Sequence, residues 1–234
     1  MLTDDVELRP AGAADLSAIA ELYLRVREAA VPSMPPNVHS DPEVREYVGS
    51  WQLDVREVWV ADSAGGLLGF ASVKGDWLDG LYVAPDAAGQ GIGSALLDVV
   101  KGLRPRGFCL WVFESNRSAR TFYDHRGLIA LESTDGSGNE ERSPDIKMAW
   151  PGADPLAFFR SLIDEVDEQL GDLFARRVAL TRAAQAHKEE ASRDPDREAE
   201  IAATMARRAP ELGPERLARI MHVVITESLD AVRE

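Results

Sequence analysis

Two patterns of apolar and polar residues divide this chain of 234 residues. Up to about residue 150, short apolar runs alternate with stretches in which apolar residues recur every three or four positions, which is typical of alternating strands and helices. Strands are expected at 6–9, 57–62, 67–73, 77–83, 108–113, 128–132 and 146–150, and helices at 13–30, 41–51, 94–102 and 116–126. The turn Ser63-Ala-Gly-Gly66 between the second and third strands predicts a hairpin.

After Pro151-Gly-Ala-Asp-Pro155 the pattern is helical throughout. Apolar residues keep helical spacing from about 156 to 191 without an internal proline, which predicts one very long helix. Asp194-Pro195 and Gly213-Pro214 begin two further helices, since proline favours a first helical turn. We therefore expect a first domain at 1–150, a linker at 151–155 and an all-helical domain at 156–234.

The helical domain is too small to enclose a good core by itself, because the long helix would leave its apolar stripe exposed. The stripe consists of Phe159, Leu162, Ile163, Val166, Leu170, Leu173, Phe174 and Val178. A second copy of the chain would cover it, so we predict an intertwined homodimer. A coiled-coil dimerisation tail without any chemistry would give the same pattern.

Composition excludes several classes of function. The net charge of −14 argues against nonspecific binding of nucleic acid or an anionic membrane. No apolar run approaches the ~20 residues that cross a bilayer, and the acidic N-terminus lacks a signal-peptide pattern, so we expect a cytoplasmic protein. The single cysteine, Cys109, lies in an apolar run and is expected to be a buried structural thiol. The four histidines lack metal-ligand spacing, so no metal is expected.

The first chemical signal is a glycine-rich turn between the strand that ends at Val83 and the next helix. Gly89-x-Gly91-x-Gly93 would present successive backbone N–H groups at the positive end of a helix, which suits a pyrophosphate. A dinucleotide-binding motif requires a βαβ unit near the start of the chain, whereas this turn follows several strands of a mixed sheet. The sequence therefore does not predict a dinucleotide site. Two motifs stand out: Val83-x-Pro85 with this turn, and Asn116 to Tyr123 followed by Gly127-Leu128. Through them the chain resembles the GNAT superfamily of N-acetyltransferases over about residues 3–150.

This resemblance implies a mixed twisted sheet with flanking helices and acetyl-CoA as co-substrate. The turn would hold the pyrophosphate, the strand end would pair with the pantetheine amides, and the Val83 N–H would polarise the thioester carbonyl. Asn116 matches a cofactor-contacting position, and Tyr123 matches the tyrosine that protonates the departing thiolate. The implied cofactor-binding residues are Leu81, Tyr82, Val83, Ala88, Gly89, Gln90, Gly91, Ile92, Gly93, Ser94 and Asn116.

Three points stay open in this domain. Family members usually carry Arg or Gln where Ala88 stands, so we expect weakened cofactor binding. Tyr123 could be a packed helix residue and Asn116 a plain N-cap. The acceptor amine is not identified. The candidate general bases are Glu28, His39, Asp79 and Glu114, although residues of this kind are more often structural or solvated.

The second chemical signal is arginine on apolar helical faces, where eleven of the twelve basic residues after Asp154 are arginines. Arginine in such excess suits carboxylate recognition, although ordinary surface charge would account for part of it. Arg160 and Arg177 are ~25 Å apart along one helix, so one small molecule could meet both only across a dimer. Lys188, Asp194, Arg197, Glu198 and Ser228 complete the spaced polar set.

This set resembles the all-helical (AroQ-type) chorismate mutases over about residues 156–234, with signatures at 159–170, at 173–177 with Lys188, and at 196–198. The resemblance implies conversion of chorismate to prephenate, a pericyclic reaction that needs a held conformer and a stabilised ether oxygen. It assigns carboxylate binding to Arg177, Ser228, Lys188 and the partner's Arg160. Lys188 would also serve the ether oxygen, Glu198 the ring hydroxyl, and Arg197 with Asp194 the organisation of the site.

The chain departs from this family at Val232, where a Gln or Glu often holds the ether oxygen. We therefore expect a bifunctional enzyme of the shikimate pathway or aromatic amino-acid biosynthesis whose mutase site is slow, needs activation or accepts another substrate. Two alternatives remain: the helical domain acts on 4-amino-4-deoxychorismate or isochorismate, or it is a non-catalytic metabolite sensor or dimerisation module for the acetyltransferase.

Overall fold

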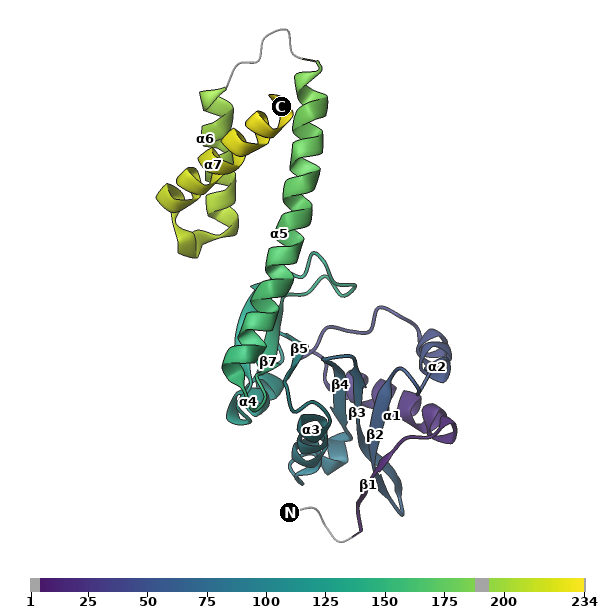
Figure 1. Ribbon diagram of the computed structural model, residues 1–234. Coiled ribbons are helices and arrows are strands. Elements are labelled where there is room, and N and C mark those ends of the chain that lie inside the picture. Colours follow the sequence, from purple (N-terminus) through teal and green to yellow (C-terminus); the bar gives the residue numbers. More distant parts are fainter. Residues whose placement is uncertain (1–4, 188–193, 234) are drawn as a thin grey trace. The chain divides into compact units, whose positions relative to one another are not determined.

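The structure is a computed structural model that describes residues 5–187 and 194–233. It divides into two compact units, residues 1–159 and 160–234, and each is described by itself (Figure 1). None of the helices among the described residues combines the length and low polarity that a bilayer span requires.

The first unit is built on a seven-stranded mixed sheet with the order β1-β2-β3-β4-β5-β7-β6. The strands are β1 (Glu7–Pro10), β2 (Glu57–Ser63), β3 (Gly66–Lys74), β4 (Trp77–Val83), β5 (Phe108–Phe113), β6 (Ile129–Thr134) and β7 (Asp145–Trp150). All neighbours are antiparallel except β4 and β5. The predicted hairpin is confirmed between β2 and β3, and Cys109 is buried as expected.

Helices cover both faces of this sheet (Figure 1). They are α1 (Leu16–Ala29), α2 (Asp41–Gly49), α3 (Ile92–Leu103) and α4 (Arg117–His125), with single 3-10 turns at Ala13–Asp15 and Pro85–Ala87. Neighbouring residues of β3 show the two faces, because side chains alternate along a strand. Gly69 faces Ile92 and Leu96 of α3, whereas the Phe70 ring contacts those of Trp51 and Tyr82 on the other side.

The sheet opens between β4 and β5, both of which are fully described. Their ladder contains one register pair, Trp77 with Cys109, so the remainder of β4 diverges from β5. On its other edge, β4 follows β3 from Val83 back to Gly80 and then shifts register, which places Asp79 in a bulge. The open side of β4 forms a cleft beside the start of α3.

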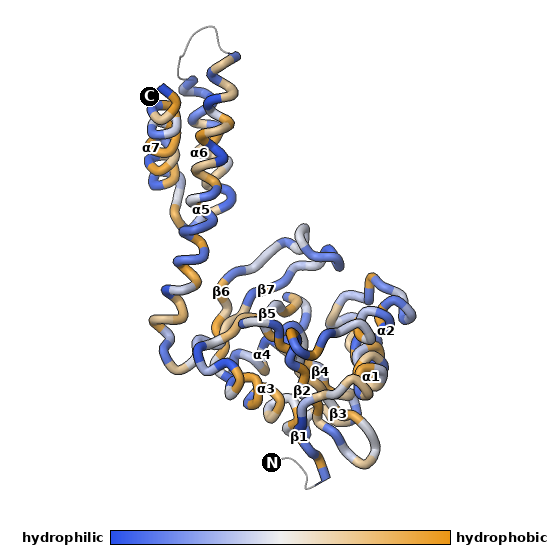
Figure 2. Tube along the Cα trace, turned by 45° about the vertical axis from the view of Figure 1, so that its right-hand side comes forward, coloured by the Kyte–Doolittle hydropathy of each residue, from blue (hydrophilic) through white to orange (hydrophobic). Residues whose placement is uncertain are grey.

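The second unit consists of the long helix α5 (Pro155–Gln185), α6 (Pro195–Arg208) and α7 (Pro214–Arg233), with a 3-10 turn at Pro210–Leu212. The predicted helices are confirmed where residues are described, although α5 ends at Gln185 and part of its expected extension to 191 lies outside the described residues. Apolar and polar residues alternate along all three helices (Figure 2). The compact units divide between Phe159 and Arg160, inside α5, because Phe158 packs against Gly107 of the first unit. The linker at 151–155 stays a prediction.

Candidate active sites

A cleft of about 1410 Å³ lies where β4 and β5 diverge. It collects almost all of the residues that the glycine-turn motif predicts for a cofactor: Leu81, Tyr82, Val83, Ala88, Gly89, Gly91, Ile92, Gly93, Ser94 and Asn116. Gln90 instead turns back, and its side-chain amide donates to the Asp86 carbonyl at 3.0 Å. One cleft therefore unites segments from β4, α3 and α4.

The backbone of β4 directs hydrogen-bond donors into this cleft. The Ala84 N–H donates to the Leu68 carbonyl of β3 at 2.8 Å. Hydrogen-bonded and non-hydrogen-bonded pairs alternate along an antiparallel ladder, so Val83, which is paired with Gly69, belongs to a non-hydrogen-bonded pair. The Val83 N–H consequently points away from β3, toward the open side where β5 has diverged.

The glycine turn supplies more donors. Gly89 and Gly91 adopt positive φ angles of 77° and 85°, a left-handed conformation that favours glycine. Gly91 is the N-cap residue of α3, so the first N–H groups of that helix have no intrahelical acceptor. The Ala95 N–H donates to the Gly91 carbonyl at 3.0 Å as the first bond of the helix, which leaves the preceding N–H groups directed out of its N-terminus. Such a turn can bind an anion through its backbone alone.

Arg126 adds a cation that the sequence motifs did not single out. It lines the same cleft, its guanidinium donates to the Ser94 hydroxyl, and its cationic centre lies 5.6 Å from the centre of the Phe122 ring. Ser94 stands in the first turn of α3. Arg126 is therefore placed to add positive charge beside the glycine turn.

Asn116 and Tyr123 bound the cleft from α4. Asn116 is the N-cap of this helix, and its side chain accepts from the Ala119 N–H at 3.2 Å. It also lines the cleft, so the role of helix cap is compatible with the predicted contact to the cofactor. The Tyr123 side chain is buried, and burial raises the pKa of its phenol well above the usual value. The phenol therefore stays protonated at neutral pH.

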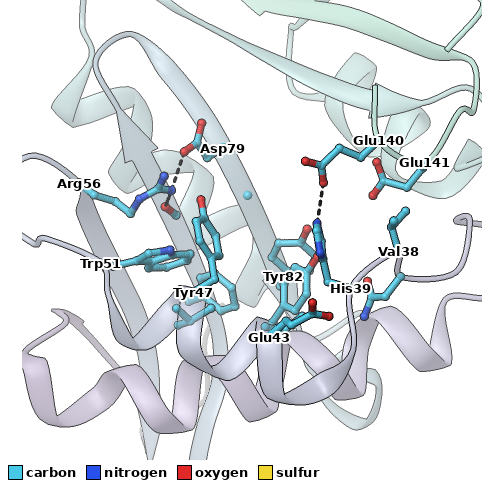
Figure 3. Close-up of a pocket in the computed structure, with 17 residues that line it drawn as sticks. Val38, His39, Glu43, Tyr47, Trp51, Arg56, Asp79, Tyr82, Glu140 and Glu141 are labelled. Atoms are coloured by element: carbon cyan, nitrogen blue, oxygen red, sulfur yellow. Dashed lines mark hydrogen bonds and ion pairs between the residues drawn. The ribbon is translucent and has the colours of Figure 1, made fainter. Parts of the chain in front are cut away.

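A second pocket, of about 630 Å³, adjoins the cleft (Figure 3). The two share Tyr23, Asp79, Gly80, Tyr82 and Glu141 as lining residues. The second pocket, here called the acceptor pocket, is walled by α2, β3, β4 and the loops before α2 and between β6 and β7. Both pockets thus meet at the bulge of β4.

Of the four candidate bases, two line the acceptor pocket. Asp79 lies at the shared wall, where Arg56 binds it at 2.5 Å. His39 makes a 2.8 Å contact with Glu140, and this partner raises the pKa of the imidazole. Glu28 and Glu114 are exposed, and neither is among the lining residues of the two pockets.

Two predicted residues of the helical unit meet at one backbone carbonyl. The Arg177 guanidinium donates to the Val224 carbonyl of α7 at 3.3 Å, and the buried Ser228 hydroxyl donates to the same oxygen at 2.6 Å. Val232 follows one turn later and is half-buried. The structure therefore brings Arg177 and Ser228 together from α5 and α7.

A second group gathers at the start of α6. Asp194 is the N-cap, and its carboxylate accepts from the Arg197 N–H at 3.0 Å, so the capping reading of Asp194 is confirmed. The Arg197 guanidinium pairs with Glu200 at 2.6 Å, and Glu198 lies on the same first turn. Arg160 is exposed on α5, and Lys188 lies outside the described residues. Among the described residues, no cluster of His, Cys, Asp and Glu could hold a metal ion.

Comparison with known proteins supports this division. The family model "Acetyltransferase (GNAT) domain" matches residues 54–127, and "Chorismate mutase type II" matches residues 159–232. The chain is 33% identical over 148 residues to the peptidyl-lysine N-acetyltransferase YiaC of Escherichia coli K12, a match that spans 62% of this chain and 96% of that protein.

Solved structures share the fold of the first unit. The apo form of YjaB from Escherichia coli superposes with a TM-score of 0.52 at 22% identity, covering 63% of this chain and 99% of that one. A GNAT-type protein from Rhodopseudomonas palustris gives 0.53 at 24%, covering 64% and 98%. The expected mixed GNAT sheet with flanking helices is confirmed. The chain belongs to the GNAT family of N-acetyltransferases, and after that domain it carries a chorismate mutase type II domain.

Proposed function

We propose that this protein is a bifunctional enzyme in which the first unit transfers acetyl from acetyl-CoA to an amine and the second converts chorismate to prephenate. The observation that carries the first activity is the donor-lined opening of β4 beside the glycine turn. GNAT acetyltransferases use acetyl-CoA, and the turn's N–H groups fit its pyrophosphate.

In the first unit, the turn from Gly89 to Gly93 and Arg126 bind the phosphates of acetyl-CoA. The Val83 N–H donates to the thioester carbonyl and stabilises the negative charge that develops there. The acceptor nitrogen attacks the carbonyl carbon, so a C–N bond forms and the C–S bond breaks. Asp79 accepts the proton of the amine, directly or through water, since it stands at the wall common to both pockets.

Tyr123 acts on the sulfur that leaves. A phenol whose pKa lies above that of a thiol releases its proton reluctantly. Tyr123 therefore first stabilises the thiolate by donating a hydrogen bond, and CoA leaves as the thiol after the proton has passed to the sulfur. YiaC is named a peptidyl-lysine N-acetyltransferase, so a lysine side chain is the first acceptor to test.

The second unit works as a homodimer. Its long helix exposes large apolar residues in the single chain, namely Leu156, Ile163, Val166, Leu170, Leu173, Phe174 and Leu180. Burying them against a second copy would release free energy of about 25 cal/mol per Å². In that dimer Arg177 and the partner subunit's Arg160 bind the two carboxylates of chorismate, with Lys188, Glu198 and Ser228 around the rest of the molecule.

Two assays test these activities separately on the full chain. Release of CoA thiol from acetyl-CoA in the presence of a lysine-containing peptide should be lost in Gly91→Asp, which adds bulk and negative charge at the phosphate turn. Loss of chorismate absorbance with formation of prephenate should be lost in Arg177→Ala, which should keep acetyl transfer. The first activity is refuted if CoA release never depends on an amine.

The sensor alternative gives a different result in the same experiments. Chorismate would then raise the melting temperature without being converted, and it would change the rate of acetyl transfer. A monomer by light scattering would contradict the shared site that includes Arg160.

A further inference from the structure

The acceptor pocket combines aromatic walls with acidic groups at its edge. Four aromatic rings contact one another in series along its wall. The distances between ring centres are 5.0 Å for Tyr23 and Tyr82, 5.2 Å for Tyr82 and Phe70, and 6.4 Å for Phe70 and Trp51. Aromatic faces attract cations and accommodate aliphatic stems. Arg56 already uses this property, since its guanidinium carbon lies 4.6 Å from the centre of the Trp51 ring.

The charges around the pocket are unequal. Its lining includes four carboxylates, on Glu43, Asp79, Glu140 and Glu141, and one arginine, Arg56. Arg56 pairs with Asp79 at 2.5 Å, and the buried Arg27 reaches Glu141 at 3.1 Å. Glu43 and Glu140 lie beside His39. Both carboxylates raise the pKa of its imidazole, and Glu140 does so more strongly than Glu43. His39 balances part of the charge of Glu140, and Glu43 accepts from the Ser40 N–H and hydroxyl. Four carboxylates thus face one arginine and one imidazole, and the excess of negative charge favours a cation at this edge of the pocket.

The loop between β6 and β7 holds Glu140 and Glu141 over the pocket (Figure 3). Asn139 anchors this loop by donating to the Ser143 carbonyl at 2.8 Å and to the Asp145 carboxylate at 2.9 Å. Gly136 has a φ of 79°, and a Cβ there would lie 2.3 Å from Ser143, so the loop requires glycine. The acidic edge is thus held by hydrogen bonds and close packing within the loop.

We infer that the acceptor is an extended aliphatic primary amine with a second positive charge, which binds between Glu43 and Glu140 while the reacting amine lies at Asp79. This inference rests on the proposed acetyl transfer and deepens it. The pocket's continuity with the cleft at Asp79, Gly80 and Tyr82 places one end of the acceptor at the acetyl group. The aromatic wall covers its stem, and the acidic edge binds the distal cation.

Three acceptors with the same five-methylene stem test the inference on the full protein at saturating acetyl-CoA. They are 1,5-diaminopentane, 1-aminohexane and 6-aminohexanoate, which differ in the group at the far end. We expect kcat/KM for the diamine to exceed that of the monoamine roughly fivefold, and 6-aminohexanoate to be the poorest, because two partly exposed carboxylates contribute modestly. The preference should shrink as salt screens the charges.

Matched variants locate the preference. Glu43 closes the capping box of α2 with Ser40, and glutamine can make the same box, so Glu43→Gln should keep the helix. Glu43→Gln and Glu140→Gln should each reduce the advantage of the diamine over 1-aminohexane, to a threefold loss at most. Asp98→Asn removes an exposed charge of α3 outside both pockets and should change neither rate.

The same chemistry could come from a free diamine or from a lysine beside a basic residue in a peptide. Comparing kcat/KM for an Arg-Lys peptide with that for an Ala-Lys peptide and for 1,5-diaminopentane distinguishes them. If Arg-Lys exceeds Ala-Lys and Glu140→Gln removes that advantage, a peptide is the acceptor, whereas poor turnover of both peptides beside good turnover of the diamine identifies a free diamine. Equal kcat/KM values for 1,5-diaminopentane, 1-aminohexane and 6-aminohexanoate would overturn the inference. No CoA release with any amine would instead overturn the proposed acetyl transfer itself.

Discussion

Arg27 and Glu141 lie 114 residues apart in the sequence and form an ion pair at 3.1 Å. Arg27 is only 3% exposed, and it also donates to Asn37 at 2.7 Å and to the Pro35 carbonyl at 3.2 Å. One buried guanidinium therefore joins α1 to the loop before α2 and to the loop between β6 and β7. All three segments contribute residues to the lining of the acceptor pocket.

Replacing this cation should destabilise the first unit. Arg27→Gln leaves Glu141 without its counter-ion and removes at least one of the loop contacts, which should cost on the order of 2–3 kcal/mol. Denaturant unfolding monitored by tryptophan fluorescence measures the loss. Arg25→Gln on the same helix is the control, because Arg25 is exposed and meets Asp86 only at 4.0 Å. Equal stability of the two variants would contradict the anchoring role.

Tyr123→Phe should separate catalysis from binding. The ring and its packing remain, so the KM for acetyl-CoA should stay constant, while kcat should fall roughly 10²-fold because the departing sulfur loses its donor. The pH profile of the wild type should show no limb from this residue below pH 9, since burial raises the pKa of its phenol. An unchanged kcat would mean that Tyr123 only fills space.

The glycine turn should be sensitive through its backbone. A Cβ at Gly91 would meet no atom within 4 Å, so the cost of Gly91→Ala comes from its φ of 85°. That strain is about 1–2 kcal/mol. Relaxation of the backbone would displace the N–H groups of the turn, so the affinity for acetyl-CoA, measured by calorimetry, should fall roughly tenfold. Gly102→Ala within α3 is also sterically free, and it should keep the affinity and slightly raise stability. Similar affinities for both variants would argue against the turn as the phosphate site.

The charges on β1 should control stability at low pH. Arg9 binds Asp15 at 2.8 Å and Asp62 at 2.7 Å, and its hydrogen bond to Asp15 lowers the pKa of that carboxyl from 3.8 to about 2. A lowered pKa means that the stabilisation is complete above pH 4 and is lost as the pH falls toward 2. Asp15→Asn should therefore weaken the dependence of unfolding free energy on pH between 4 and 2, and an unchanged slope would refute the pairing.

Periodicity and turn chemistry were sufficient to predict the elements of this chain, because strands, helix starts and glycine turns depend on local sequence. Asp194 shows this well: its position before Pro195 predicts an N-cap, and its carboxylate makes that bond. The predicted α3 helix began at residue 94, and the structure starts it at Ile92, since a helix can begin directly after a left-handed glycine.

The acceptor pocket was not predictable in the same way. Glu140 and His39 are 101 residues apart, and their contact depends on how the β6–β7 loop folds back over β4. Arg126 was missed because it follows the helix motif and carries no signature of its own, although its position just before Gly127 could have marked it. Contacts between distant loops depend on the tertiary structure and leave no local pattern.

Val232 provides the sharpest test of the helical unit. It is half-buried one helical turn after Ser228. The resemblance to the mutases predicts at this position a side chain that holds the ether oxygen. Restoring a donor with Val232→Gln should raise the rate of chorismate conversion at least tenfold, because one such donor can contribute ~10²–10³ in rate. Val223→Gln on the same helix is the control, since Val223 is 55% exposed and a polar residue there should leave the rate unchanged. If Val232→Gln binds chorismate, as measured by its melting temperature, but is no faster than the wild type, then Val232 does not limit the reaction and the sensor alternative gains support.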